Sequence, residues 1–230
     1  GTKILQVNAS KRIISYSLKN GEAINCHYGH LFNCCGVNSD NIARKFDVTQ
    51  RYKILPFKGI YWKLKSNKNF AIKTNIYPIP DLNLPFLGVH ITPSLSGDIF
   101  LGPTAIPAFG KENYYGFDGI EPLLAAKFLG DLTIQFFKNK EGFRKYAFDQ
   151  ALHGMKPFFL RSAQKIIPSL KNEDLIKSKK VGIRAQLFDY KRRELIDDFK
   201  LIRDQNSTHI LNAISPAFTA SFALADHIIK

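Results

Sequence analysis

The segment Val181-Gly182-Ile183-Arg184-Ala185-Gln186-Leu187-Phe188-Asp189 returns the chain to a β-strand after a series of helical patterns, and this return decides the fold class. Its side chains alternate, so Ile183 shares one face with Ala185 while Gly182, Arg184 and Gln186 share the other. Earlier strand patterns cover 3–7, 13–18, 54–64, 71–77 and 86–92, and helical patterns cover 122–137, 141–153 and 157–166. Strands, then helices, then strands predict an α+β or interrupted α/β fold.

The C-terminal segment continues with a hairpin and a helix. Residues 194–202 form the second arm of the hairpin, around a turn at 190–193, and 209–212 form a brief strand. Ser215 precedes Pro216, which is the signature of a helix start, and 218–229 continue as an Ala-rich helix. We expect 1–50 and 181–230 to belong together, with 51–180 inserted between them as a mixed antiparallel sheet flanked by helices.

Composition restricts the class of protein. The 230 residues contain no apolar run of about 18, so no spanning helix is expected. Three cysteines without a C-x-x-C motif predict neither a disulfide framework nor a zinc site, and no metal is expected. This thiol usage is typical of a reducing compartment and predicts a cytoplasmic protein.

The net charge of +14 favours anionic partners. Residues 51–73 hold seven basic side chains and no acidic one: Arg51, Lys53, Lys58, Lys63, Lys65, Lys68 and Lys73. A solvated basic face is one interpretation, and peripheral contact with the anionic inner face of a membrane is another. Nucleic acid is not an expected partner, because the chain has no nucleic-acid-binding motif.

Two strands carry candidate catalytic side chains. His90 shares a strand face with Gly88 and Thr92, which leaves room for a ligand, and imidazole can act as a base near neutral pH. A hydrogen-bonded structural histidine is the alternative. Arg184 presents a planar fork that matches a carboxylate, although an ion pair with Asp197 or Asp198 across the hairpin would explain it equally well.

Several common catalytic motifs are absent from the sequence. It contains no G-x-G-x-x-G, no G-x-x-x-x-G-K-[ST], no G-x-S-x-G and no H-E-x-x-H. The segment 212–219 at the start of the predicted C-terminal helix could still bind an anion or the electron-rich edge of a cofactor through free amides.

Seven blocks in order resemble the later part of FAD-dependent oxidoreductases of the D-amino-acid-oxidase-like superfamily, and most closely the L-2-hydroxyglutarate dehydrogenases and oxidases. Asn33-Cys34-Cys35-Gly36-Val37-Asn38-Ser39-Asp40 resembles N-x-A-G-x-x-S-D, and Pro56-Phe57-Lys58-Gly59-Ile60-Tyr61 resembles P-F-R-G-x-Y with Lys in place of Arg. The others are 77–81, 85–92, 101–105, 182–186 and 212–221.

The resemblance implies FAD as the cofactor and oxidation of a 2-hydroxy acid, such as a small dicarboxylate, to a 2-keto acid. It implies His90 as the base or hydroxyl partner, Arg184 as the carboxylate clamp and Lys58 as the second cation for a diacid. The cofactor contacts that it implies are Gly36, Gly182, Ile183, Ser215, Pro216, Ala217, Phe218 and Thr219. The helix after Pro216 would direct its amides at the flavin.

The superfamily's dinucleotide-binding G-x-G-x-x-G unit has no counterpart in this sequence. We therefore expect an N-terminal FAD-binding segment outside this chain to supply the nucleotide contacts, so that the chain alone would bind FAD poorly. The alternatives are an inactive fragment or binding module, and a related flavoenzyme that acts on an amino acid or on glycerol phosphate.

Overall fold

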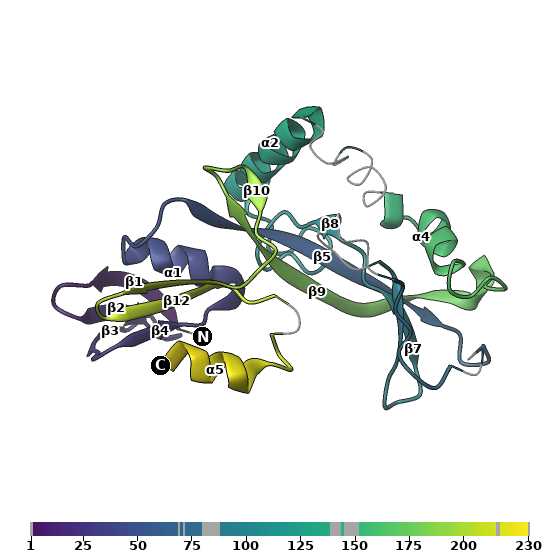
Figure 1. Cartoon of the computed structure of the whole chain (residues 1–230), viewed down its shortest axis with the longest axis horizontal. Coiled ribbons are helices and arrows are strands. Elements are labelled where there is room, and N and C mark those ends of the chain that lie inside the picture. Colours follow the sequence, from purple (N-terminus) through teal and green to yellow (C-terminus); the bar gives the residue numbers. More distant parts are fainter. Residues whose placement is uncertain are drawn as a thin grey trace. The chain divides into compact units, whose positions relative to one another are not determined.

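A computed structural model describes residues 2–68, 70, 72–79, 88–138, 144, 152–214 and 217–229. The chain divides into two compact units (Figure 1). Unit 1 comprises Gly1–Leu55 and Ala185–Lys230, and unit 2 comprises Pro56–Arg184. Two long strands, β5 (Tyr52–Leu64) and β9 (Leu175–Asp189), contribute residues to both units.

Unit 1 contains two small sheets. The first is an antiparallel meander of β1 (Lys3–Asn8), β2 (Ile13–Ser17) and β3 (Ala23–His27). The second has the order β11-β12-β4, in which β12 (Ser207–Asn212) runs antiparallel to β11 (Lys200–Asp204) and parallel to β4 (Leu31–Asn33). Because β4 and β12 are parallel, their carboxyl ends lie at one edge of this sheet.

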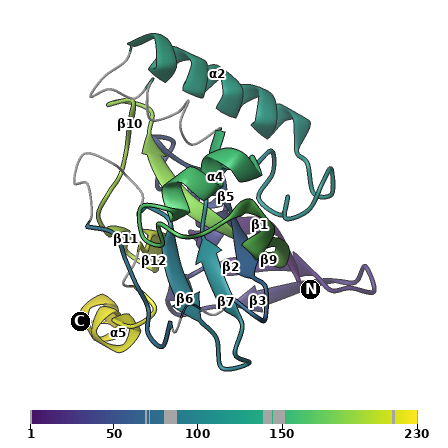
Figure 2. The same ribbon diagram turned by 90° about the vertical axis from the view of Figure 1, so that its right-hand side faces the viewer.

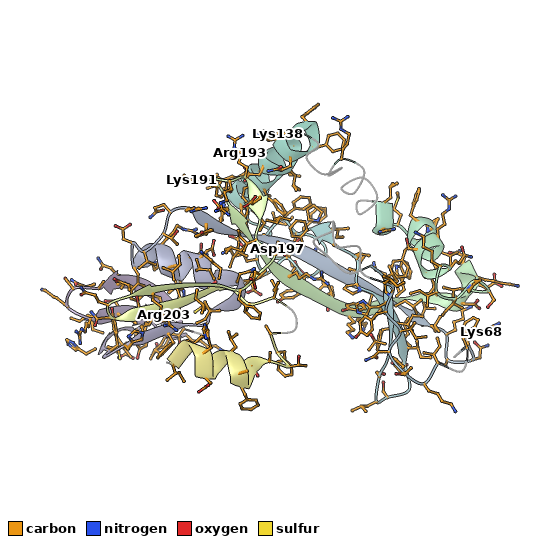
Figure 3. All side chains as sticks on the ribbon, viewed as in Figure 1. Lys68, Lys138, Lys191, Arg193, Asp197 and Arg203 are labelled. Carbon is orange, nitrogen blue, oxygen red and sulfur yellow. The ribbon has the colours of Figure 1, made fainter. Side chains whose placement is uncertain are left out.

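The helices of unit 1 follow these parallel strands. A 3-10 turn (Gly36–Asn38) and α1 (Ser39–Lys45) come after β4, and α5 (Ser221–Ile229) comes after β12. The apolar core of this unit joins Ala43 of α1 to Ile54, Leu187 and Leu211. The short β10 (Glu194–Leu195) pairs with β9 around a turn that contains Lys191 and Arg193, both labelled in Figure 3.

Unit 2 is built on a curved sheet, in which β6 (His90–Pro93) and β7 (Ile99–Gly102) lie side by side (Figure 2). The order of the whole six-stranded sheet is β10-β9-β5-β7-β6, and β8 (Ile106–Pro107) also pairs with β5. The pairs β5–β7, β5–β8 and β6–β7 are antiparallel.

Two helices pack against the sheet of unit 2. The helix α4 (Lys156–Ala163) places Phe159, which is 0% exposed, against Ile91 of β6 and Leu101 of β7. The helix α2 (Pro122–Lys138) buries Phe128 against Phe57, with the two rings edge to face at 5.3 Å. A second 3-10 turn (Asn172–Asp174) leads into β9.

The α+β class and most of the predicted elements are confirmed. The prediction of one strand over 194–202 was wrong, because β10 ends at Leu195 and pairs with β9, whereas β11 belongs to the separate sheet β11-β12-β4. Residues 72–77 contribute only a bridge from Ile76 to Ile91, and the described part of 86–92 becomes a strand only at His90. Most of the helix predicted over 141–153 lies outside the described residues.

The C-terminal helix starts later than its sequence predicts. Ser215 and Pro216 lie outside the described residues, and 217–220 form turns that precede α5. The amide of Ala217 donates to Ile214 O (2.8 Å) and that of Ser221 to Phe218 O (3.3 Å). Both hydrogen bonds join residues three apart in the sequence, as in a turn, and the regular helix begins only at Ser221, so the prediction of a helix running through Phe218 was wrong.

Candidate active site

One face of the unit 2 sheet points away from α4. Ile91 and Leu101 are cross-strand partners in the core, so the residues that alternate with them point to the opposite side. His90 lies opposite Gly102 on that side, and the same alternation applies along β5 and β9. We call this surface the open face; it comprises Tyr61, Lys63, His90, Thr92, Phe100, Lys180, Gly182 and Arg184.

A backbone carbonyl determines which ring nitrogen of His90 carries the proton. Its Nδ1 lies 3.3 Å from the carbonyl oxygen of Gly88, which can only accept a hydrogen bond, so Nδ1 carries the proton of the neutral ring. Nε2 then holds the lone pair. Burial lowers the pKa of His90; the Gly88 bond opposes this, and the charges of Arg184 and Lys180 lower the pKa further. The ring is therefore neutral near pH 7 and can accept a proton at Nε2.

Two tyrosines interact with this imidazole or with Arg184. The Tyr77 ring lies 4.8 Å from that of His90, at an angle of 33°. Burial raises the pKa of Tyr61, while the positive charge of Arg184 lowers it, so its hydroxyl is protonated near neutral pH and can donate. Arg184 on β9 thus acts electrostatically on both Tyr61 of β5 and His90 of β6.

Gly102 makes room for Tyr61 on this face. It has a φ of +146°, and a Cβ there would lie 2.8 Å from Tyr61 Cδ1 and 2.9 Å from the carbonyl oxygen of Ile60. Any larger residue would displace the Tyr61 ring or the β5 backbone. Packing of the open face therefore requires glycine at this position.

Lys58 lies apart from this group. It precedes Tyr61 by three residues on β5, an odd spacing that directs the two side chains to opposite sides of a regular strand. Its Nζ donates to Oδ1 of the buried Asn113 at 2.9 Å, and burial lowers the pKa of Lys58. The described structure therefore does not bring Lys58 together with His90 and Arg184.

The expected cofactor residues divide between the two units. Gly182 lies on the open face between Lys180 and Arg184, where an added Cβ would have no heavy atom within 4 Å among those in the structure. Ile183 points to the opposite side of β9. The open surface at Gly182 is compatible with the close approach of a flat group such as a flavin ring.

The remaining expected cofactor residues belong to unit 1. Gly36 follows β4 with a φ of +54°, and an added Cβ would again meet no atom within 4 Å. Ala217, Phe218 and Thr219 follow β12, and the Phe218 side chain is 93% exposed. Loops beyond the carboxyl ends of parallel strands are common ligand sites in α/β proteins, so this edge also suits a cofactor.

A buried polar chain supports the turn at Gly36. Asn33 Nδ2 donates to the carbonyl oxygen of Ser39 (2.8 Å) and to Nδ1 of His209 (3.0 Å), while its Oδ1 accepts from the Cys35 amide (3.3 Å). His209 Nε2 in turn donates to Ser207 Oγ (2.9 Å). Burial lowers the pKa of His209, which favours the neutral ring that this pattern requires.

The sequence argument did not assign roles to Tyr61, Tyr77, Lys180, Asn33 or His209. Tyr61, Tyr77 and Asn33 do occur within the blocks that carry the family resemblance. Lys180 has no such signal, since it is one of several lysines near the start of β9. The described residues contain no group of three or more His, Cys, Asp or Glu side chains arranged to hold a metal ion.

The open face brings the positive charges of Arg184 and Lys180 within electrostatic range of a neutral imidazole. A family model described as FAD dependent oxidoreductase matches residues 1–230. The chain therefore belongs to this family of FAD-dependent oxidoreductases. No helix in the described ranges is long and apolar enough to cross a membrane.

Curated relatives are similar over most of this chain. The L-2-hydroxyglutarate dehydrogenase of Indibacter alkaliphilus is 36% identical over 211 residues, which cover 87% of this chain and 49% of the relative. The human L-2-hydroxyglutarate dehydrogenase, described as mitochondrial, is 35% identical over 221 residues, which cover 90% of this chain and 45% of the relative. The chain thus spans about half the length of these relatives.

Two solved structures have a similar fold. The L-α-glycerophosphate oxidase of Mycoplasma pneumoniae, with FAD bound, has a TM-score of 0.55 and 14% identity over 99% of this chain and 49% of its own. The glycerol-3-phosphate dehydrogenase of Bacillus halodurans, complexed with FAD, has a TM-score of 0.53 and 13% identity over 99% of this chain and 38% of its own. At this identity the similarity concerns the fold alone.

Proposed function

We propose that this chain carries the substrate-binding side chains of an enzyme that uses FAD to oxidise a 2-hydroxy acid of the L-2-hydroxyglutarate type to the 2-keto acid. The observation that supports this proposal is the grouping of a neutral, backbone-oriented His90 with Arg184 on one open face. The names of the relatives support the choice of substrate class.

The reaction removes a proton from the hydroxyl group and a hydride from the carbon that bears it. Bound FAD supplies the acceptor for the hydride. His90 Nε2 takes the hydroxyl proton, because Nδ1 is already committed to the Gly88 carbonyl. The Arg184 fork binds the neighbouring carboxylate and orients the substrate, and the Tyr61 hydroxyl can donate to the same group.

The cofactor would be held mainly by backbone. We assign this role to Gly36, Gly182, Ile183 and the segment from Ser215 through Thr219, with 1–50 and 181–230 forming the FAD-binding part and 51–180 the substrate-binding part. The helix α5 begins at Ser221, five residues after Pro216 in the sequence, and its N-terminus carries the positive end of the helix dipole. A segment outside this chain would supply the nucleotide contacts.

Replacement of Arg184 tests the proposal in the FAD-loaded protein. Arg184→Lys keeps the charge but removes the fork, so we expect kcat/KM for L-2-hydroxyglutarate to fall about 30-fold, mainly through KM. Lys179→Met serves as the control, because Lys179 is exposed and lies on the other side of β9. An unchanged KM in Arg184→Lys would remove the clamp assignment.

The substrate class is tested in the same assay. Anaerobic bleaching of the flavin absorbance is measured with L-2-hydroxyglutarate and with sn-glycerol 3-phosphate. Bleaching by the hydroxy acid alone supports the proposal. Bleaching by the glycerol phosphate alone would mean that the cations of the open face bind a phosphate group, and it would overturn the proposed 2-hydroxy acid substrate.

A further inference from the structure

Lys180 occupies a defined position on the open face. Its Nζ lies 4.6 Å from the centre of the Tyr61 ring and 4.9 Å from that of Phe100, so two aromatic faces hold the ammonium group. Tyr61 belongs to β5 and Phe100 to β7, so the Lys180 ammonium group contacts rings from two other strands of the sheet. A cation held in this way loses less side-chain freedom when an anion binds than a freely rotating lysine would.

Lys180 also differs from its neighbour Lys63, the other lysine of the open face. Lys63 Nζ forms an ion pair with Asp98 at 2.7 Å. For Lys180, no carboxylate of the described residues lies within ion-pair distance. Its cation–π interactions with the two rings are weaker than an ion pair. A carboxylate brought by a ligand would therefore find Lys180 available.

The spacing of Lys180 and Arg184 suits a ligand with two anionic groups. Both lie on the same side of β9, separated by four residues, which corresponds to about 13 Å between Cα atoms. Their long side chains can bend toward one another over Gly182, where the surface is open. Both cations act on His90, which places the imidazole within their electrostatic range.

We propose that Lys180 is the specificity-determining residue for the second carboxylate of a dicarboxylate substrate, with Arg184 binding the carboxylate next to the reacting hydroxyl group. This assignment rests on the proposed function and replaces Lys58, whose Nζ is bonded to Asn113. The chemical class selected is a short 2-hydroxy diacid over a 2-hydroxy monoacid.

The test compares diacid with monoacid in the FAD-loaded protein. In Lys180→Met, we expect kcat/KM for L-2-hydroxyglutarate to fall about 30-fold, which is typical for the loss of a charge-assisted contact, and that for L-2-hydroxybutyrate to change less than about threefold. Lys180→Arg should retain most of the preference for the diacid. Lys179→Met is the matched control and should behave as the wild type.

Inhibitor binding gives a second, independent measurement. Glutarate and butyrate differ by one carboxylate, and wild type should bind glutarate more tightly, with the difference lost in Lys180→Met. Equal losses on diacid and monoacid, or no loss on either, would overturn the assignment of Lys180 while leaving 2-hydroxy acid oxidation in place. An unchanged preference for glutarate in Lys180→Met would also overturn the Lys180 site. If the wild type oxidises no 2-hydroxy acid, the proposed function itself fails.

Discussion

The ion pair at the end of β9 allows a stability change to be calculated from the structure. Asp189 is 1% exposed and accepts two hydrogen bonds from Arg51 Nε, at 2.9 and 2.8 Å, and a further contact from Arg51 Nη2. The amides of Lys191 and Arg192 also donate to this carboxylate. The bonds from Arg51, followed by these amides, lower the pKa of Asp189 from 3.8 to about 2 against the opposing effect of burial.

This lowered pKa of Asp189 means that its ionised carboxylate contributes to the free energy of unfolding. At 1.36 kcal/mol per pH unit, the difference between 3.8 and about 2 is worth about 2.5 kcal/mol. Arg51 is 36% exposed, so solvent screening reduces the expected contribution to about 1.5 kcal/mol. A carboxyl group with a lowered folded-state pKa stabilises the protein fully above its unfolded-state pKa, and about half of this contribution is lost by pH 3.

Asp189→Asn should therefore lower the free energy of unfolding by about 1.5 kcal/mol at pH 7 and by about half as much at pH 3. Urea unfolding followed by circular dichroism measures both values. Asp197→Asn is the control, because Asp197 is exposed on the connection between β10 and β11 (Figure 3) and should change stability by less than about 0.5 kcal/mol. A difference between wild type and Asp189→Asn that is absent at pH 7, or equal at pH 7 and pH 3, would refute the reasoning.

Three further changes have defined outcomes. Lys180→Met removes a positive charge that lowers the pKa of His90, so a nuclear magnetic resonance titration of the ring should give a higher pKa than in wild type; an unchanged value would place Lys180 out of range. Asn33→Ala should cost about 3 kcal/mol in urea unfolding by leaving buried partners unpaired, whereas the exposed Asn20→Ala should cost almost nothing. Phe159→Ala should cost about 3–5 kcal/mol by opening a cavity under the sheet, and a loss below about 1 kcal/mol would contradict the core described for unit 2.

Periodicity predicted the long helix α2, but it captured the longest strand, β9, only from Val181, six residues after its start. Leu124 and Phe128 repeat at helical spacing, and both are buried in α2. The start of α5 was not predictable in this way. Ser215-Pro216 matches the sequence signature of a helix start, but the hydrogen bonds donated by the Ala217 and Ser221 amides close turns instead. Local sequence preference favoured an earlier start, and the choice between a turn and a helix depends on what the segment packs against.

The open face was only partly accessible from the sequence. Alternation within single strands predicted which neighbouring residues share a strand face with His90 and with Arg184. It could not show that β6 and β9 belong to one sheet. Lys58 and Lys180 are both basic strand residues, and only the cross-strand register distinguishes the lysine bonded to Asn113 from the one held over Tyr61. Long-range pairing, which no local pattern encodes, decides which of them can bind a ligand.

The most direct measurement of the central claim is the rate of flavin reduction in His90→Gln, mixed anaerobically with saturating L-2-hydroxyglutarate. If His90 Nε2 takes the hydroxyl proton, this rate should fall about 100-fold or more, and its rise with pH through a pKa below 6.5 should disappear. His27→Gln, at an exposed position on β3, should keep the wild-type rate. A reduction rate in His90→Gln within about threefold of wild type, with the same pH dependence, would contradict the role of His90 as the base.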